Sequence, residues 1–325
     1  MTRIAVAGAG AIGCFVGGLM AAQGHDLRLM ARGSTLAALR AGALRLTDYG
    51  TLELEVPIAQ ASDDPAILED AEVVLVTCKT AATAEIAGNI ARYAPQDAPV
   101  ISFQNGLDAA DILRGALPGR DVRAAMVPFN VVRPGPGHFH RATSGDILVQ
   151  DGPLPDLSAR ALRIAPHPDI HGVQYGKLLI NLNNALNALA DVPIVEQLQI
   201  RAWRTLWADQ MAEALGVLKA AGITPAKATS VAPGLIPHIL RLPTPLFRRI
   251  AAKMLTIDPH ARSSMWDDLT QRRLTEVDAL QGHIIALAAQ HGRSAPVNAA
   301  VLAAIRAAEA RGDGPPGLAP ADLRG

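Results

Sequence analysis

The sequence predicts an α/β fold, with a doubly wound parallel sheet in its first half and an all-helical second half. Two observations carry this prediction. In roughly the first 150 residues, short apolar runs alternate with helix-like segments, as expected of parallel strands that helices cover on both faces. Beyond about residue 170, only helical segments follow. The 325 residues suffice for two domains, which we place at residues 1–170 and 171–312, before a tail at 313–325.

Four apolar runs of the first half predict the strands of the sheet. They are RIAVAG, DLRLMA, EVVLVTC and PVISFQ, and the helices between them span residues 11–23, 34–41, 80–92 and 107–116. After Gly119, the segments AAMVPFNVV and GDILVQDG flank the turn-rich PGPGHFHRATSG. We expect a hairpin-like addition to the sheet there.

Helical spacing of apolar residues predicts the elements of the second half. The expected helices span residues 173–190, 196–221, 234–255, 264–272 and 276–291, with breaks at Gly222–Pro225, Pro243–Pro245 and Asp258–Pro259. The tail, RGDGPPGLAPADLRG, is rich in glycine and proline, which predicts disorder.

Charge and composition exclude several classes of protein. Lysine plus arginine equals aspartate plus glutamate, so no global charge attracts nucleic acid or an anionic membrane. No signal peptide and no uncharged apolar run of membrane-spanning length is present, so we expect a cytoplasmic protein. The two cysteines, Cys14 and Cys78, lie in apolar segments, which favours buried free thiols over a disulfide. The nine histidines show no metal-ligand spacing, so we expect no metal.

A glycine-rich turn joins the first strand to the first helix. It consists of Gly8, Ala9, Gly10, Ala11, Ile12 and Gly13. In a dinucleotide-binding turn the first glycine permits the tight bend, and the second lets a pyrophosphate approach the backbone. The third lets helix and strand pack closely, while the helix N-terminus offers N–H groups to the phosphates. The alternative is a strand–helix turn with no ligand.

Arg32 lies at the end of the second predicted strand, about 20 residues past the glycines. NAD-binding proteins usually place an acid there, for the ribose 2′-hydroxyl. A guanidinium instead suits a 2′-phosphate, so we predict NADP(H) as the cofactor. In the alternative interpretation, Arg32 is a solvated loop charge.

Two further strand ends carry polar side chains, Lys79 after EVVLVTC and Asn105 after PVISFQ. In open α/β sheets, ligands bind outside the carboxyl ends of the strands, so both side chains are candidates for the cofactor crevice. Alternatively, Lys79 is a solvated helix-start lysine and Gln104-Asn105-Gly106 an ordinary turn.

The segment GKLLINLNNALNAL combines a leucine stripe with a lysine and four asparagines. On one continuous helix, Lys177, Asn181 and Asn184 share a face opposite the leucines, and Asn183 and Asn187 lie on the flank. Asparagine is a poor helix former, so a solvated face would not favour it. We interpret the shared face as a hydrogen-bonding wall with a lysine proton donor. Alternatively, the amides satisfy buried backbone groups between helices.

At these positions the sequence resembles the ketopantoate reductases. The resemblance covers roughly residues 1–310 and rests on GAGAIG, CKT at 78–80, QNG at 104–106, GKLLIN at 176–181 and SSM…TEVDALQG at 263–282. It implies an N-terminal Rossmann dinucleotide-binding domain, a helical C-terminal domain and NADPH as hydride donor. The implied reaction reduces 2-dehydropantoate to pantoate, on the way to coenzyme A.

The resemblance also implies roles for individual residues. Lys177 matches the catalytic general acid, and Glu276 a glutamate near the nicotinamide and the reacting oxygen. The other matches are Asn105 for cofactor and substrate, Asn181 and Ser264 for substrate, and Arg32 and Lys79 for NADPH. The family's second helix asparagine falls at Ala185, so we expect Asn184 to replace it, and a further one falls at Ile194.

Ser264 and Glu276 set a geometric condition on a shared site. On a straight helix the two residues would be about 18 Å apart, too far for one small substrate. We therefore predict a break near Arg272–Leu274, supported by the capping pattern Thr275-Glu-Val-Asp278. Ser264-Met-Trp-Asp267 also fits a plain helix start, with Ser264 as the N-cap.

Three hypotheses for the function follow. The first is an NADPH-dependent ketopantoate reductase, and the second is a reductase of another small 2-oxo or 3-oxo acid. The third is a non-catalytic NADP-binding sensor, which accounts for the glycine turn but not for Lys177, Asn181, Ser264 and Glu276 together. We expect a small oxo acid as the binding partner, and a homodimer through the helical half.

Overall fold

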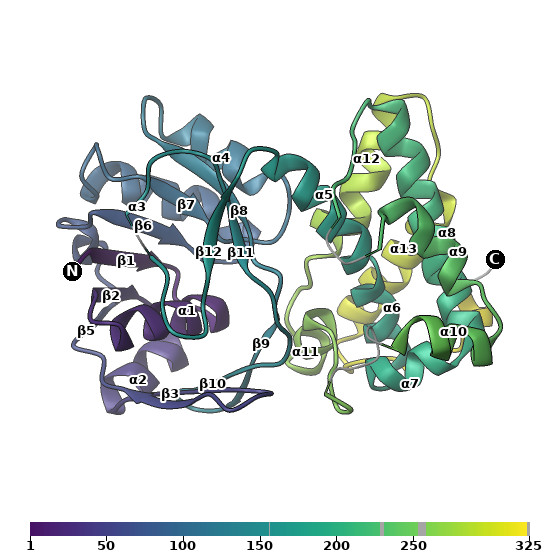
Figure 1. The fold of residues 1–325 in the computed structure, drawn as a ribbon, viewed down its shortest axis with the longest axis horizontal. Coiled ribbons are helices and arrows are strands. Elements are labelled where there is room, and N and C mark those ends of the chain that lie inside the picture. The colour runs from purple at the N-terminus through teal and green to yellow at the C-terminus, as the bar shows by residue number, and fades with distance from the viewer. Residues whose placement is uncertain (156, 228–230, 253–257, 324–325) are drawn as a thin grey trace. The chain divides into compact units, whose positions relative to one another are not determined.

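The computed structural model describes residues 1–155, 157–227, 231–252 and 258–323. The chain divides into two compact units, Met1–Ile170 and His171–Gly325. The first unit is a mixed α/β domain and the second is built of helices, which confirms the predicted fold class (Figure 1).

The main sheet of the first unit has eight strands in the order β12-β11-β8-β7-β6-β1-β2-β5. From β5 to β8 all neighbouring strands are parallel, and their order along the chain is the 3-2-1-4-5-6 order of a Rossmann fold. The four predicted strands are its centre. The bounds are β1 Arg3–Ala7, β2 Asp26–Met30, β5 Gln60–Ser62, β6 Val73–Val76, β7 Val100–Ser102, β8 Val122–Met126, β11 Ile147–Gln150 and β12 Ile164–His167.

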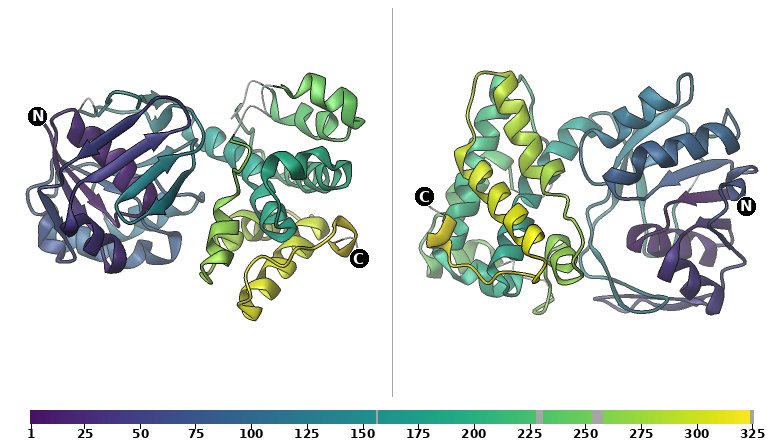
Figure 2. Two further views of the ribbon diagram at one scale, coloured as in Figure 1. Left: turned by 90° about the horizontal axis from the view of Figure 1, so that it is seen from below. Right: turned by 180° about the vertical axis from the view of Figure 1, so that it is seen from behind.

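Each face of this sheet has its own apolar core, because successive side chains of a strand point to opposite faces. In β1, Ile4 and Val6 pack with Phe15 of α1, whereas Ala5 and Ala7 pack in the layer beneath α3 and α4 (Figures 1 and 2). The helices of the unit are α1 Ala11–Ala22, α2 Gly33–Ala41, α3 Thr83–Tyr93 and α4 Ala109–Ala116, as predicted to within a few residues.

A second sheet of four strands, in the order β4-β3-β10-β9, covers the outer side of α1. The prediction of one hairpin-like addition is therefore only partly right. β11 does pair antiparallel with β8, but the intervening segment predicted as a turn forms the β9–β10 hairpin, and β10 pairs with β3. Its prolines and glycines hid the alternation of half-buried and buried side chains in HFHR. The bounds are β3 Leu44–Asp48, β4 Glu53–Val56, β9 Val131–Gly135 and β10 His138–Arg141.

The second unit contains helices packed on helices, shown from two sides in Figure 2. Their bounds are α5 Ile170–Asn181, α6 Asn183–Ala190, α7 Ile194–Gln199, α8 Arg201–Ala220, α9 Ile236–Leu240, α10 Thr244–Ile250, α11 Ser264–Thr270, α12 His283–Gln290 and α13 Pro296–Arg311. A π-helical turn, Asp278–Gly282, precedes α12. Helix α13 was not predicted, because its many alanines give little contrast between its faces. The predicted end of the 234–255 helix at residues 253–255 lies outside the described residues.

Two predicted helices are each divided in two. Residues 173–190 break at Leu182, where the Leu179 carbonyl accepts from Trp207 Nε1 (3.4 Å) and the Leu182 carbonyl from Gln281 Nε2 (2.9 Å). Residues 196–221 break at extended Ile200, because Arg204 Nη1 donates to the Leu198 carbonyl (2.8 Å). Both breaks depend on side chains that the local pattern does not reveal.

The predicted disorder of the tail is wrong for residues 313–323. The Leu318 N–H donates to the Leu189 carbonyl (2.8 Å), and Leu323 is buried in a short 3₁₀ turn. Backbone pairing and two leucines thus fix a segment whose composition alone suggests a mobile chain.

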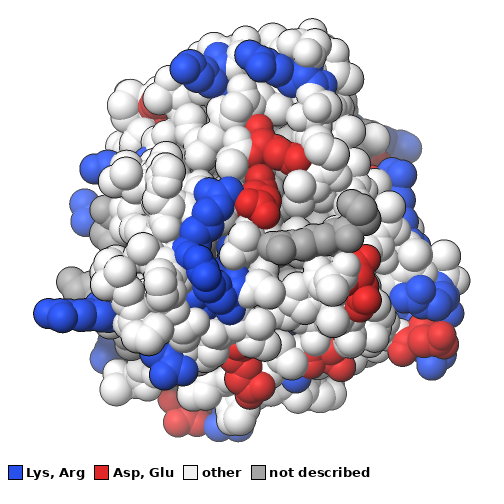
Figure 3. Space-filling view, turned by 90° about the vertical axis from the view of Figure 1, so that its right-hand side faces the viewer, with Lys and Arg blue, Asp and Glu red and all other residues white. Residues whose placement is uncertain are grey.

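Acidic and basic side chains lie beside one another on the face of Figure 3, in line with a formal net charge of zero. Among the described residues, no helix combines the length and the hydropathy that a membrane span requires.

Candidate active site

The glycine turn lies between β1 and α1. At its first and third positions, neighbouring protein atoms leave no room for a larger residue than glycine. Gly8 has a φ of +83°, and a Cβ there would lie 2.6 Å from Cys78 Cβ. A Cβ on Gly13 would lie 2.3 Å from Thr77 Oγ1. The Thr77 hydroxyl also donates to the Gly8 carbonyl (2.9 Å), so the end of β6 holds the turn in place. The sequence reasoning missed Thr77, although its position at a strand end was a signal.

Gly10 is different, because no protein atom requires it to be glycine. A Cβ there would meet nothing nearer than 4.0 Å, and its φ of −85° suits any residue. Gly10 is the N-cap of α1, which has no side-chain cap and no acidic residue in its first turn. An open glycine beside uncapped N–H groups fits a pyrophosphate, as in a dinucleotide site.

Arg32 lies two residues after the end of β2, at the N-cap of α2, and forms an ion pair with Glu85 of α3. Both side chains are more than half exposed, and the hydrogen bond from Arg32 lowers the pKa of the Glu85 carboxyl. An exposed pair of this kind contributes little stability, so a phosphate can compete with Glu85 for the guanidinium.

The ends of β6 and β7 carry Lys79 and Asn105, as predicted, and they meet at one edge of the sheet. The Thr80 hydroxyl donates to the Asn105 carbonyl (3.3 Å). Gln104 is buried and donates to Thr83 Oγ1 (2.7 Å) and to the Cys78 carbonyl (3.1 Å), so it fixes the turn that carries Asn105. Lys79 is exposed and Asn105 half-buried.

The cysteines beside the glycine turn are free thiols, as predicted. Burial raises the pKa of the Cys14 thiol to about 12, so it stays protonated and packs as an apolar group.

Lys177 projects from α5 of the helical unit and is half-buried. Burial lowers the pKa of its ammonium to about 8, and the charge of Glu276 partly opposes that shift. The two residues that the resemblance paired thus act on each other electrostatically. A lysine with a pKa near the working pH is a suitable proton donor.

The four asparagines divide into two pairs. Asn183 and Asn187 are buried, at 7 % and 0 % exposure, and both bond with Gln197. Asn181 and Asn184 are partly exposed, and in the described part of the chain their side-chain amides form no hydrogen bond. The alternative interpretation, amides that satisfy buried groups, is therefore confirmed for Asn183 and Asn187, and the hydrogen-bonding wall stays a prediction for Asn181 and Asn184. The leucine stripe is confirmed, with Leu178, Leu179, Leu182, Leu186 and Leu189 all buried.

Ser264 is the first residue of α11, and it is not the N-cap that the pattern suggested. The cap is Ser263, whose Oγ accepts from the Trp266 N–H (3.2 Å). Ser264 remains partly exposed. Asp267 lies in the first turn as expected, and burial, with Asp268 nearby, raises its pKa to about 6.

The chain breaks between Ser264 and Glu276, as predicted. Helix α11 ends at Thr270, and Arg272 is left-handed with a φ of +54°. The Thr275 hydroxyl then accepts from the Val277 N–H (3.2 Å), which starts the next helical segment. The condition for Ser264 and Glu276 to serve one substrate is therefore met within the helical unit.

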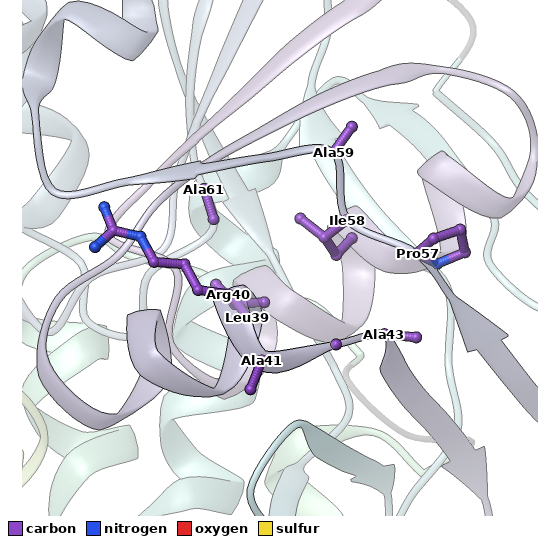
Figure 4. Close-up of a pocket in the computed structure, with 9 residues that line it drawn as sticks. Leu39, Arg40, Ala41, Ala43, Pro57, Ile58, Ala59 and Ala61 are labelled. Carbon is purple, nitrogen blue, oxygen red and sulfur yellow. The ribbon is translucent and has the colours of Figure 1, made fainter.

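A cavity of about 490 Å³ lies in the first unit between the end of α2 and the chain before β5 (Figure 4). Its lining is mostly apolar, and its one charged side chain, Arg40, pairs with Asp63. None of the predicted site residues lines it, so we do not connect it with the candidate site. Across the described residues, no three His, Cys, Asp or Glu side chains are grouped as a metal site requires.

Comparison with known proteins connects both halves of the chain to one family. Ketopantoate reductase PanE/ApbA matches residues 4–153, and the C-terminal domain of the same family matches residues 169–309. A 2-dehydropantoate 2-reductase of Archaeoglobus fulgidus is 28% identical, over 94% of this chain and 98% of its own length.

Two solved structures show the same fold. A PanE/ApbA family ketopantoate reductase from Ralstonia eutropha JMP134 has a TM-score of 0.81 and 28% identity, covering 95% of this chain and 99% of its own. D-mandelate dehydrogenase with NADH and anilino(oxo)acetate has a TM-score of 0.79 and 21% identity, with the same coverage. The chain therefore belongs to the ketopantoate reductase (PanE/ApbA) family and is an oxidoreductase that acts on a CH–OH or ketone group.

Proposed function

We propose that the protein reduces 2-dehydropantoate to pantoate with NADPH, and that Lys177 is the general acid. The observation that carries the proposal is the pKa of Lys177, lowered by burial to about 8 beside Glu276. Membership of the family supports the reaction, and the geometry of the glycine turn supports a dinucleotide.

Residues of the first unit hold the cofactor in this proposal. The backbone of Gly8, Ala9, Gly10, Ala11, Ile12 and Gly13 binds the pyrophosphate at the N-terminus of α1. Arg32 and Lys79 bind the 2′-phosphate of NADPH, and Asn105 orients the nicotinamide end. When bound, the nicotinamide supplies the hydride that reaches C2 of the oxo acid.

Lys177 acts on the ketone oxygen. Its Nζ donates a hydrogen bond to that oxygen and stabilises the negative charge that grows there during reduction. It then gives one proton to that oxygen, which becomes the hydroxyl of pantoate. Glu276 keeps part of the lysine population protonated by raising its pKa against the effect of burial.

The exposed amides and the serine hydroxyl hold the substrate. Asn181 and Asn184 carry side-chain amides that form no hydrogen bond among the described residues, and Ser264 lies on the helix after the buried Ser263 cap. They supply donors for the carboxylate and the hydroxyl of an oxo acid. Ala185 is fully buried in the core, which supports Asn184 as the substrate-facing residue.

Turnover by the parent and by Lys177→Ala tests the proposal. NADPH oxidation is followed with 2-dehydropantoate and with a panel of other 2-oxo and 3-oxo acids. We expect 2-dehydropantoate to give the highest kcat/KM. Lys177→Ala should lower kcat by about 10²–10⁴-fold while NADPH affinity, from fluorescence titration, stays the same.

Three other outcomes have definite meanings. A higher kcat/KM with another oxo acid would assign that acid as the substrate. NADPH binding without turnover of any acid would support a sensor. Near-normal turnover by Lys177→Ala would remove Lys177 as the acid.

A further inference from the structure

Asn183 and Asn187 take no part in the proposed chemistry, yet both are buried in the helical unit. Buried amides are normally paired with other buried polar groups, and the partners of these two differ. Asn183 exchanges hydrogen bonds with Gln197 (both 3.2 Å). Asn187 also donates to the Val192 carbonyl (2.9 Å) and accepts from the Ser263 N–H (2.8 Å). Of these two asparagine side chains, only Asn187 bonds to the start of α11 among the described residues.

Ser263 completes this connection with its hydroxyl. Ser263 Oγ donates to the Asn184 carbonyl (2.8 Å) and accepts from the Trp266 N–H (3.2 Å). The residue is 3 % exposed, so water does not compete for these bonds. One serine thus caps α11 and binds the backbone of the residue whose side chain we assign to the substrate.

We infer that Asn187 and Ser263 are positioning residues of the substrate site. They hold Asn184 of α6 and Ser264 of α11 in one fixed relation, although neither touches the substrate. The inference rests on the proposed function, because it takes Asn184 and Ser264 as ligands of the oxo acid. Small displacements matter at such a site, because moving a substrate-holding group by about 1 Å can lower the reaction rate by a factor of about 10².

Asn183 provides a matched control on the same helix. It is buried like Asn187 and shares Gln197 with it, but no hydrogen bond joins it to α11. Asn183→Ala and Asn187→Ala both leave buried polar groups unpaired, and both should lower the Tm. Only Asn187→Ala also releases the Ser263 N–H.

Steady-state kinetics with 2-dehydropantoate below each Tm separate positioning from stability. We expect Asn187→Ala and Ser263→Ala to raise the KM about 5–50-fold, with a smaller effect on kcat. Asn183→Ala should lower the Tm without changing the KM. Ser263→Ala is the decisive variant, because it removes one hydroxyl and leaves the Ser263 N–H bond to Asn187 in place. Ser263→Thr keeps the hydroxyl and should return the KM toward the parent value.

A double-mutant cycle identifies the route of the effect. In an Asn184→Ala background, Ser263→Ala should raise the KM less than it does in the parent, because the side chain it positions is gone. An unchanged KM in Ser263→Ala, or equal KM changes in Asn183→Ala and Asn187→Ala, would overturn the inference. A parent that turns over no oxo acid would overturn the proposed function itself, and the positioning role with it.

Discussion

The side chains of α5 and α6 show how one residue type serves two purposes within a few positions. Within the described parts of the chain, the side-chain amides of Asn181 and Asn184 form no hydrogen bond, whereas those of Asn183 and Asn187 satisfy buried backbone and side-chain groups. Lys177 differs from the asparagines because it can carry a charge, and its burial removes part of the water that would stabilise that charge. Sequence position alone does not separate these roles, because they depend on the partners that the fold brings to each side chain.

The depressed pKa of Lys177 has a consequence for stability. The native state binds this proton less tightly than the unfolded chain, so Lys177 destabilises the fold below about pH 8, and the penalty disappears as pH rises from about 8 to about 10.5. Lys177→Met should therefore raise the free energy of unfolding by about 1–3 kcal/mol at pH 7 while it abolishes turnover. The gain should be absent at pH 10.5. Urea unfolding at both pH values measures it, and a loss of stability at pH 7 would contradict the assigned burial.

Arg32 and Glu85 provide a residue-scale test of cofactor choice. Arg32→Ala should raise the KM for NADPH by about 10–100-fold and leave the KM for NADH nearly unchanged, because only NADPH carries the 2′-phosphate. Glu85→Gln removes a competitor for the guanidinium and should lower the KM for NADPH. If Arg32→Ala changed the KM for NADPH and the KM for NADH equally, this arginine would not bind the 2′-phosphate.

At the scale of elements, the placement of α1 depends on close contact with the strands beside it. Gly13 lets the helix approach Thr77 and Val6 of neighbouring strands, and the Thr77 hydroxyl fixes the turn before it. The small sheet then covers the outer side of α1 through its buried leucines, Leu44 and Leu46. The geometry of the glycine turn is thus a product of packing on both sides of one helix.

Two alanine substitutions separate packing from ligand binding in this turn. Gly13→Ala places a Cβ 2.3 Å from Thr77 Oγ1, so we expect a loss of about 1–3 kcal/mol in stability from overpacking. Gly10→Ala meets no protein atom within contact distance, so the Tm should not fall, yet the KM for NADPH should rise. Tm measurements and NADPH titrations on both variants check this. Normal NADPH binding by a folded Gly10→Ala would contradict the pyrophosphate assignment.

At the scale of the whole molecule, the sequence predicts the helices and strands that local patterns encode. It does not predict those features that depend on contacts between residues far apart in the chain. The central strands were found because each is a short apolar run, and α1 to α4 because they lie between these runs. The β9–β10 hairpin was missed because its prolines and glycines hide the alternation of its side chains, and its pairing with β3 because that strand lies far away in the chain. Helix α13 was missed because its many alanines do not distinguish a buried face from an exposed one. The break at Leu182 depends on Trp207 and Gln281, so no local pattern shows it.

The candidate site shows the same division. The glycine turn and the strand-end residues Lys79 and Asn105 follow from position in a doubly wound sheet. Ser264 and Glu276 came from the resemblance, and the break between them was predicted from the helix distance and from the capping pattern Thr275-Glu-Val-Asp278. Thr77, Gln104 and Ser263 were not singled out, because their importance lies in hydrogen bonds to residues that only the fold brings near.

The pH dependence of kcat/KM for NADPH oxidation with 2-dehydropantoate tests the central claim most directly. Lys177 must be protonated to donate, and its pKa lies at about 8. The account predicts a plateau at neutral pH and a tenfold fall per pH unit above about pH 8. A rate that stays level to pH 10, or no turnover of 2-dehydropantoate at any pH, would contradict it.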